Sequence, residues 1–192
     1  MASFERAIPI ILEHEGGYAD NPADPGGATK YGVSLRYLQS ELAGDSDHDG
    51  RLDGDLDGDG DVDADDIRAL TVDRAITIYR SRWWDRYGYG RIDDDNAATK
   101  IFDVAVNMGA KRAHLLAQRA AYSCGQIQLV DDGILGPLSV EAINTCWPTV
   151  FLHRLCTLQA QFYRNLAIRK PQMEVFLNGW LQRARWPFQG AV

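Results

Sequence analysis

Residues 15–34 read EGGYADNPADPGGATKYGVS, and this stretch decides the fold. It follows the largely apolar run at 7–14, which predicts a helix. Gly16 and Gly17 mark the end of that helix, because glycine favours the residue just past a helix C-terminus. Residues 18–33 are rich in Gly, Pro, Asn and Asp and therefore predict a loop or a short hairpin. The last side chain of the helix is thus expected at the edge of a loop region.

Further helices are predicted from capping and turn residues. Ser34 can cap a helix over 35–42, and Thr71 can cap one over 72–84 that has Tyr79 among its apolar positions. Asp95 or Asn96 can begin the next helix. Pro137 can occupy the first position of a helix over 138–146, and Pro171 opens a last helix to about residue 183.

Two carboxylates of this stretch have contrasting surroundings. Glu15 ends the helix, where the negative end of the helix dipole and apolar neighbours both disfavour its ionised form. Asp24 lies among Pro and Gly in a polar loop, where we expect it to stay ionised. Glycoside hydrolysis uses such a pair, one as general acid and the other to activate water or stabilise the sugar cation. The alternative is a surface glutamate that closes a helix, followed by an Asp-Pro-Gly turn.

The same stretch resembles the signature of glycoside hydrolase family 108, muramidases found as phage endolysins and as secretion-associated wall lysins. Three later blocks follow in the family's order, at 70–88, 102–109 and 131–143. The C-terminal segments FLHRLCTLQAQFYRNLA and FLNGWLQRA resemble the family's predicted peptidoglycan-binding domain. The acidic segment at about 45–64 is outside the resemblance. The resemblance implies a mainly α, lysozyme-like fold with a small loop or hairpin region near the active-site cleft.

The resemblance also implies an organisation and an activity. Residues 1–100 would form the catalytic region, and 101–192 a helical peptidoglycan-binding-like region packed on it in one compact two-lobed unit. The implied reaction is hydrolysis of the β-1,4 bond between N-acetylmuramic acid and N-acetylglucosamine in peptidoglycan, in a phage endolysin. Glu15 would protonate the leaving oxygen, and Asp24, together with Thr29, would position or deprotonate water or stabilise the transition state.

Three more residues are candidates for substrate binding. Tyr18 and Tyr31 offer aromatic faces that suit saccharide rings, with packing beneath the loop as the alternative. Asn107 lies near a predicted helix end and is a candidate to hydrogen-bond an N-acetyl sugar, with helix capping as the alternative. Thr29 follows Asp24 more closely than in phage lysozymes, so a turn-forming hydroxyl is its alternative role.

Residues 45–66 hold eleven Asp against one Arg and carry a second chemical signal. A calcium loop of the EF-hand type has oxygen ligands at alternating positions, glycine at position 6 and an aliphatic residue at position 8. A frame that begins at Asp55 has Gly60 and Val62 at these two positions. Its predicted ligands are Asp55, Asp57, Asp59, Asp61, Asp63 and Asp66. The last of them is an aspartate instead of the usual glutamate, as in dockerin-like loops, which lowers the expected affinity.

A second frame extends the predicted ligands to Asp45, Asp47, Asp49 and Asp53. It has Gly50 at position 6 and Leu52 at position 8, but Leu56 at position 12, so it predicts a half-site or one completed by neighbouring carboxylates. The alternative is a solvated acidic linker. Because so many carboxylates repel one another unless a cation neutralises them, we expect bound Ca²⁺ in a structural or regulatory role.

The net charge of −7 is concentrated in this acidic segment. The segment alone carries −10, so the rest of the chain carries +3. The basic side chains of residues 151–192 are Arg154, Arg164, Arg169, Lys170, Arg183 and Arg185. A cationic C-terminal half suits an anionic partner such as the cell wall or an anionic outer-membrane surface. Without a helix-turn-helix, zinc or RNA-recognition motif we expect no nucleic-acid partner, and we expect a monomer.

No apolar run approaches the ~18–20 residues of a membrane span. The N-terminal sequence lacks the basic region and the cleavage site of a signal peptide. We therefore expect synthesis in the cytoplasm of a bacterial host and action on the wall after release or secretion. Two alternatives remain for the function. One is a lytic transglycosylase in which Glu15 acts alone, and the other is a non-catalytic, calcium-dependent wall-binding protein.

Overall fold

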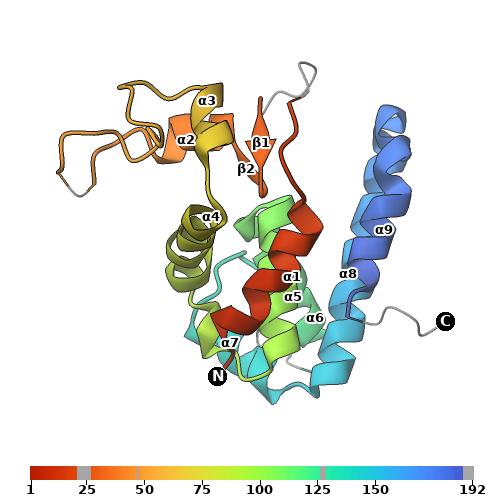
Figure 1. Cartoon of the computed structure of the whole chain (residues 1–192). Coiled ribbons are helices and arrows are strands. Elements are labelled where there is room, and N and C mark those ends of the chain that lie inside the picture. The colour runs from red at the N-terminus through yellow and green to blue at the C-terminus, as the bar shows by residue number, and fades with distance from the viewer. Residues whose placement is uncertain (21–26, 47, 126–128, 188–192) are drawn as a thin grey trace. The chain divides into compact units, whose positions relative to one another are not determined.

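The computed structural model describes residues 1–20, 27–46, 48–125 and 129–187. The chain is mainly helical (Figure 1) and divides into two compact units. The smaller unit comprises residues 8–79, and the larger unit comprises residues 1–7 together with 80–192. None of the helices in the described part of the chain is long and apolar enough to span a membrane.

The smaller unit contains the end of α1 (Phe4–Glu15) and a hairpin. The helix ends where the sequence predicts, because Gly16 has a φ of 73° and its N–H still bonds the carbonyl of Leu12 at 3.3 Å. Strands β1 (Thr29–Lys30) and β2 (Val33–Ser34) pair antiparallel, with Lys30 opposite Val33. The hairpin therefore turns within two residues.

Three further helices belong to this unit, and side chains cap each of them. Helix α2 (Leu35–Glu41) begins after Ser34, whose Oγ accepts the N–H of Tyr37 at 3.2 Å, as expected. Helix α4 (Val72–Tyr79) begins after Thr71, whose hydroxyl accepts a backbone N–H in the first turn. Helix α3 (Ala64–Ala69) closes the acidic segment and begins with a capping box between Asp63 and Asp66.

The larger unit consists of helices around a buried aromatic centre. Its elements are η1 (Arg80–Asp85), η2 (Tyr89–Arg91), α5 (Asp95–Met108), α6 (Ala110–Tyr122), α7 (Pro137–Thr145), α8 (Pro148–Arg169), η3 (Pro171–Phe176) and α9 (Leu177–Arg185). Helix α5 is buried along most of its length and packs against α6 and α8. Phe4, Trp84, Tyr89 and Phe102 meet there, with ring centroids 5.6–6.3 Å apart.

Several helix boundaries differ from the sequence-based expectation. The helix expected over 72–84 is α-helical only to Tyr79 and continues as the π-helix η1. The last helix begins as the 3-10 helix η3 before it becomes α9. The cap of α5 is Asp94, which accepts the N–H of Ala97 at 2.8 Å, because the carboxylate of Asp95 is bonded to the N-terminal segment instead.

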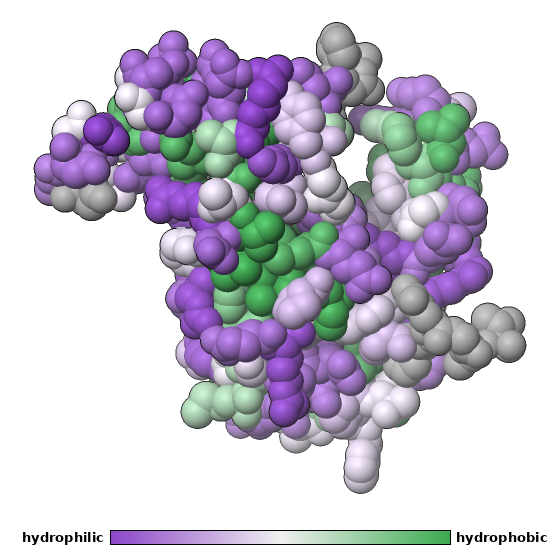
Figure 2. Space-filling model, viewed as in Figure 1, coloured by the Kyte–Doolittle hydropathy of each residue, from purple (hydrophilic) through white to green (hydrophobic). Residues whose placement is uncertain are grey.

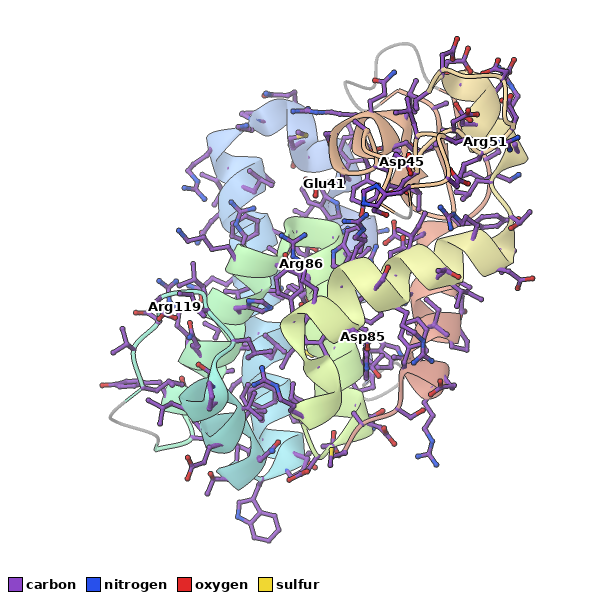
Figure 3. The ribbon with its side chains drawn as sticks, turned by 90° about the vertical axis from the view of Figure 1, so that its left-hand side faces the viewer. Glu41, Asp45, Arg51, Asp85, Arg86 and Arg119 are labelled. Atoms are coloured by element: carbon purple, nitrogen blue, oxygen red, sulfur yellow. The ribbon has the colours of Figure 1, made fainter. Side chains whose placement is uncertain are left out.

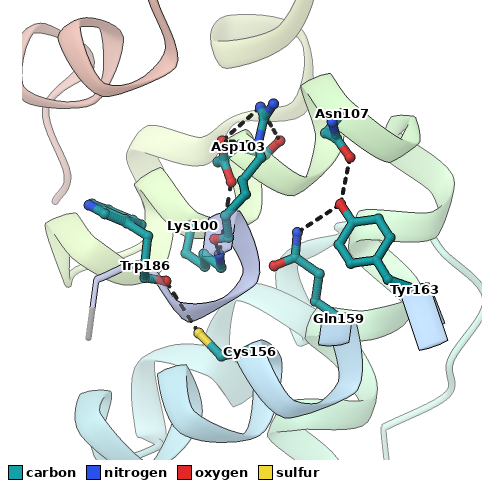
Figure 4. Close-up of polar contacts among 8 residues, drawn as sticks. Lys100, Asp103, Asn107, Cys156, Gln159, Tyr163 and Trp186 are labelled. Atoms are coloured by element: carbon teal, nitrogen blue, oxygen red, sulfur yellow. Dashed lines mark hydrogen bonds and ion pairs between the residues drawn. The ribbon is translucent and has the colours of Figure 1, made fainter. Parts of the chain in front are cut away.

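A buried ion-pair cluster joins α5 to α9 (Figure 4). Asp103 is fully buried, and its Oδ1 lies 2.8 Å from Nη2 of Arg183. Lys100, also fully buried, lies 3.9 Å from Oδ2 of Asp103 and donates to the backbone carbonyl of Arg183 at 2.8 Å. Burial lowers the pKa of Lys100, and the charge of Asp103 opposes that effect. Removal of one partner would leave a buried charge uncompensated, so this cluster holds α9 in place.

Candidate active site

Glu15 lies half-buried at the end of α1, directly against the hairpin turn. A Cβ atom placed on Gly32 would lie 2.7 Å from both Cγ and Oε2 of Glu15, and closer still to the hydroxyl of Tyr79. Real Cβ atoms do not approach other heavy atoms so closely, so any side chain at this position would force Glu15, Tyr79 or the turn to shift. The backbone of the turn is therefore one wall of the space that holds the Glu15 carboxylate.

A hydrogen bond from α4 holds the turn in place. Tyr79 is 1% exposed, and its hydroxyl donates to the backbone carbonyl of Tyr31 at 2.9 Å. Tyr31 and Gly32 have φ angles of 51° and 75°, the left-handed values required at both centres of a tight two-residue hairpin turn. The end of α1, the hairpin and the end of α4 thus converge on the carboxylate of Glu15.

Thr29 lies on the same hairpin, and Tyr18 precedes the residue that pairs with it. Thr29 opens β1, and its hydroxyl donates to the carbonyl of Gly27 at 3.3 Å, while its backbone pairs with Ala19. Tyr18 is 42% exposed and donates to the carboxylate of Asp20 at 3.3 Å. Asp24 lies outside the described residues. The catalytic and sugar-binding roles of these residues stay predictions.

Asn107 belongs to the larger unit and lies in the last turn of α5. Its side-chain oxygen accepts a hydrogen bond from the hydroxyl of Tyr163 at 2.5 Å, and that hydroxyl accepts one from Gln159 at 3.2 Å (Figure 4). The oxygen of Asn107 is therefore used to join α5 to α8. Contact with an N-acetyl group remains a prediction for its amide nitrogen.

Sequence reasoning missed Tyr79 and the particular role of Gly32. The sequence marks Tyr79 only as an apolar position of a predicted helix, and any large apolar side chain would fit that pattern. The pair Tyr31-Gly32 is a turn signal, but it does not say which side chain the turn will contact. Both roles depend on contacts between segments far apart in the sequence.

The acidic segment repeats one local geometry in both predicted frames. Asp55 Oδ2 accepts the N–H of Gly60 at 3.1 Å, and Asp45 Oδ2 accepts that of Gly50 at 3.0 Å. The two glycines have φ angles of 104° and 89°, so each permits the sharp bend expected at position 6. Asp47, a predicted ligand of the second frame, lies outside the described residues.

Two groups of carboxylates gather in the first frame. Within each group the potential ligand atoms lie within 4.8 Å of one another, and the groups are Asp55, Asp57 and Asp59, and Asp61, Asp63 and Asp66. The pKa of Asp61 is raised, mainly by repulsion from Asp59. The pKa of Asp57 is raised by desolvation first and by neighbouring carboxylates second. A bound cation would relieve this repulsion.

Asp66 and Arg51 have distinct places in this segment. Asp66 is 1% exposed, and its two oxygens accept the N–H groups of Leu56 at 2.6 Å and Asp63 at 2.7 Å. It therefore joins the start of the loop to helix α3. Arg51 (labelled with Asp45 in Figure 3) is the one arginine of the segment, and its guanidinium lies beside Gly58.

The fold and the matched families define the class of protein. Residues 8–109 match the family Glycosyl hydrolase 108, and residues 112–185 match the family Predicted Peptidoglycan domain. The chain is therefore a member of glycosyl hydrolase family 108, a glycosidase whose substrate is peptidoglycan. The resemblance in the sequence is confirmed.

A solved structure described as the structure of Brucella abortus SagA is similar over nearly the whole chain. The two share 26% sequence identity and a TM-score of 0.70, over 94% of this chain and 88% of that one. The expected mainly α, lysozyme-like fold is thus confirmed. A search among curated proteins found no match.

Proposed function

We propose that this glycosidase is an N-acetylmuramidase, a lysozyme that hydrolyses the β-1,4 bond between N-acetylmuramic acid and N-acetylglucosamine and serves as a phage endolysin. The observation that supports it is the carboxylate of Glu15 at the end of α1, which lies against the Gly32 turn that Tyr79 bonds. A carboxyl group at the edge of this turn suits proton transfer to a substrate oxygen, because a general acid acts within hydrogen-bond reach.

In this mechanism Glu15 donates its proton to the glycosidic oxygen as the bond between that oxygen and the sugar carbon breaks. Water adds its oxygen to the resulting oxocarbenium-like carbon, and the second carboxylate takes the released proton. The family resemblance implies that Asp24 is this second carboxylate and that Thr29 acts with it to position water. Tyr18, Tyr31 and Asn107 are the proposed contacts with the sugars.

The products distinguish hydrolysis from the transglycosylase reaction. Hydrolysis adds one water and leaves a reducing N-acetylmuramic acid end, whereas a transglycosylase leaves an anhydro end that lacks this water. We expect digestion of purified peptidoglycan to release only fragments with reducing ends, as measured by mass spectrometry. Anhydro ends would contradict the muramidase proposal. Binding to sacculi with no soluble fragments would contradict any catalytic function.

We propose further that the acidic segment binds Ca²⁺ through the carboxylates of Asp55, Asp57, Asp59, Asp63 and Asp66 and the backbone carbonyl of Asp61. Carboxylate oxygens are the ligands that this ion prefers, and both glycine bends suit a calcium loop. Bound Ca²⁺ would offset the repulsion in the segment and hold α3, which begins within it, in place. Protons compete for the same carboxylates, so binding should weaken as the pH falls.

Calcium removal is expected to lower the melting temperature, and calcium is expected to restore it. Preferential binding to the folded protein adds ~2.7 kcal/mol to its free energy of unfolding at a hundred times the dissociation constant. Thermal melts with a chelator, with Ca²⁺ and with Mg²⁺ measure this effect, and Mg²⁺ should substitute poorly because it requires tight octahedral geometry. Asp59→Asn should reduce the response, whereas Asp73→Asn, at an exposed site in α4, should not. If a calorimetric titration shows no calcium uptake at millimolar concentrations, the calcium proposal is wrong and the segment is a solvated acidic loop.

A further inference from the structure

The larger unit exposes an apolar surface where α8 passes through η3 into α9 (Figure 2). We call it the apolar tip, formed by Ile168, Met173, Val175, Phe176 and Leu177. Ile168 and Val175 are 76% and 79% exposed, and Phe176 is 53% exposed. Single exposed apolar residues are common, but a group of them rimmed by charge marks an interaction site.

The aromatic ring at the centre of the tip is held by a stack of rings. Phe176 lies on Trp180 with ring centroids 5.7 Å apart, and Trp180 stacks on Tyr163 at 5.0 Å and an interplanar angle of 20°. Tyr163 is buried and bonded to Asn107. The exposed ring of Phe176 therefore projects from a fixed base, and little conformational freedom is lost when a partner covers it.

Three cations lie at the C-terminal end of α8, where the apolar tip begins. Arg164, Arg169 and Lys170 are exposed, and none of them forms an ion pair within the described part of the chain. Glu174 is the only acidic residue between positions 151 and 192. The three cations outnumber Glu174, so the rim of the tip has a net positive charge.

We propose that the apolar tip inserts into the headgroup boundary of an anionic phospholipid bilayer. The apolar side chains would replace water with acyl chains, while the three cations contact lipid phosphates. Long basic side chains suit this place, because their stems lie along apolar surface and their charges stay at the headgroups. A second copy of the chain would bring the same positive rims together. A purely ionic wall polymer would leave the apolar side chains in water.

Sedimentation with lipid vesicles tests the proposed membrane binding, which is independent of the proposed cleavage of peptidoglycan. We expect the protein to bind vesicles of phosphatidylglycerol and phosphatidylcholine, with weaker binding at high salt, and to leave phosphatidylcholine vesicles unbound. The double variant Val175→Ser, Phe176→Ser should bind about tenfold more weakly or worse, because interfacial binding scales with buried apolar area. The variant Arg169→Gln, Lys170→Gln should lose most of the salt dependence.

A matched control is available in the same unit. Ile134 and Leu138 are 67% and 75% exposed, and replacing both with Ser should leave vesicle binding unchanged. Thermal melts establish that each variant is folded. Vesicle binding that survives in both tip variants would overturn the proposal. Binding to sacculi but not to vesicles would identify a wall polymer, and a dimer lost on Phe176→Ser would identify a second copy.

Discussion

Glu15→Gln is expected to remove nearly all lysis of peptidoglycan, with a loss of about a hundredfold or more. An amide has the size of the carboxyl group and fits the same space beside Gly32, but it has no acidic proton to give to the glycosidic oxygen. The protein should therefore fold and melt like the wild type. The measurement is the initial rate of clearing of purified peptidoglycan, together with chromatography of the released fragments.

Glu13→Gln is the matched control for this substitution. Glu13 is in the same helix, two residues earlier, and is exposed. The same change of charge and shape should leave the rate near that of the wild type. If Glu15→Gln kept more than about a tenth of the wild-type turnover, general acid catalysis by this residue would be excluded. A comparable loss in both variants would indicate an effect of charge on wall binding.

Local sequence signals predicted most of the helix boundaries. Ser34 and Thr71 accept backbone N–H groups at the starts of α2 and α4, as a capping side chain should. Gly16 ends α1 with a left-handed backbone, and Pro137 occupies the first position of α7. Each of these signals acts within one helical turn, so the sequence of a few residues is enough to predict it.

Contacts between distant segments were not predictable in this way. The charge pattern places Arg183 among the cations of the C-terminal surface, but only 11% of its side chain is exposed, and it pairs with Asp103 on α5. The hydrogen bond from Tyr79 to Tyr31 joins residues 48 positions apart. A helix pattern marks Tyr79 as apolar, yet its hydroxyl is the group that contacts the turn. Such roles emerge only when the units are folded.

Gly32→Ala is the second substitution for which we expect a large loss of lysis, because Gly32 lies against Glu15. Alanine at this position meets two obstacles. The backbone of Gly32 has a φ of 75°, which is unfavourable for a residue with a side chain and lowers the stability of the alanine variant by about 1 kcal/mol. Its methyl group would also overlap the Glu15 carboxylate and the Tyr79 hydroxyl, so the turn, the carboxylate or both must move. A displacement of about 1 Å at a reacting group costs about a hundredfold in rate, and we expect that loss of lysis.

Gly109→Ala is a control that separates the effect of backbone strain at a positive φ from the effect of moving Glu15. Gly109 has a similar φ of 84°, but an added Cβ there would meet nothing within 4 Å. Both variants should therefore lose stability in thermal melts, whereas only Gly32→Ala should lose lysis. Equal activity in the two variants would mean that the turn can give way without moving Glu15. A selective loss would show that the glycine of the hairpin is needed for catalysis because its missing side chain leaves room for the acid.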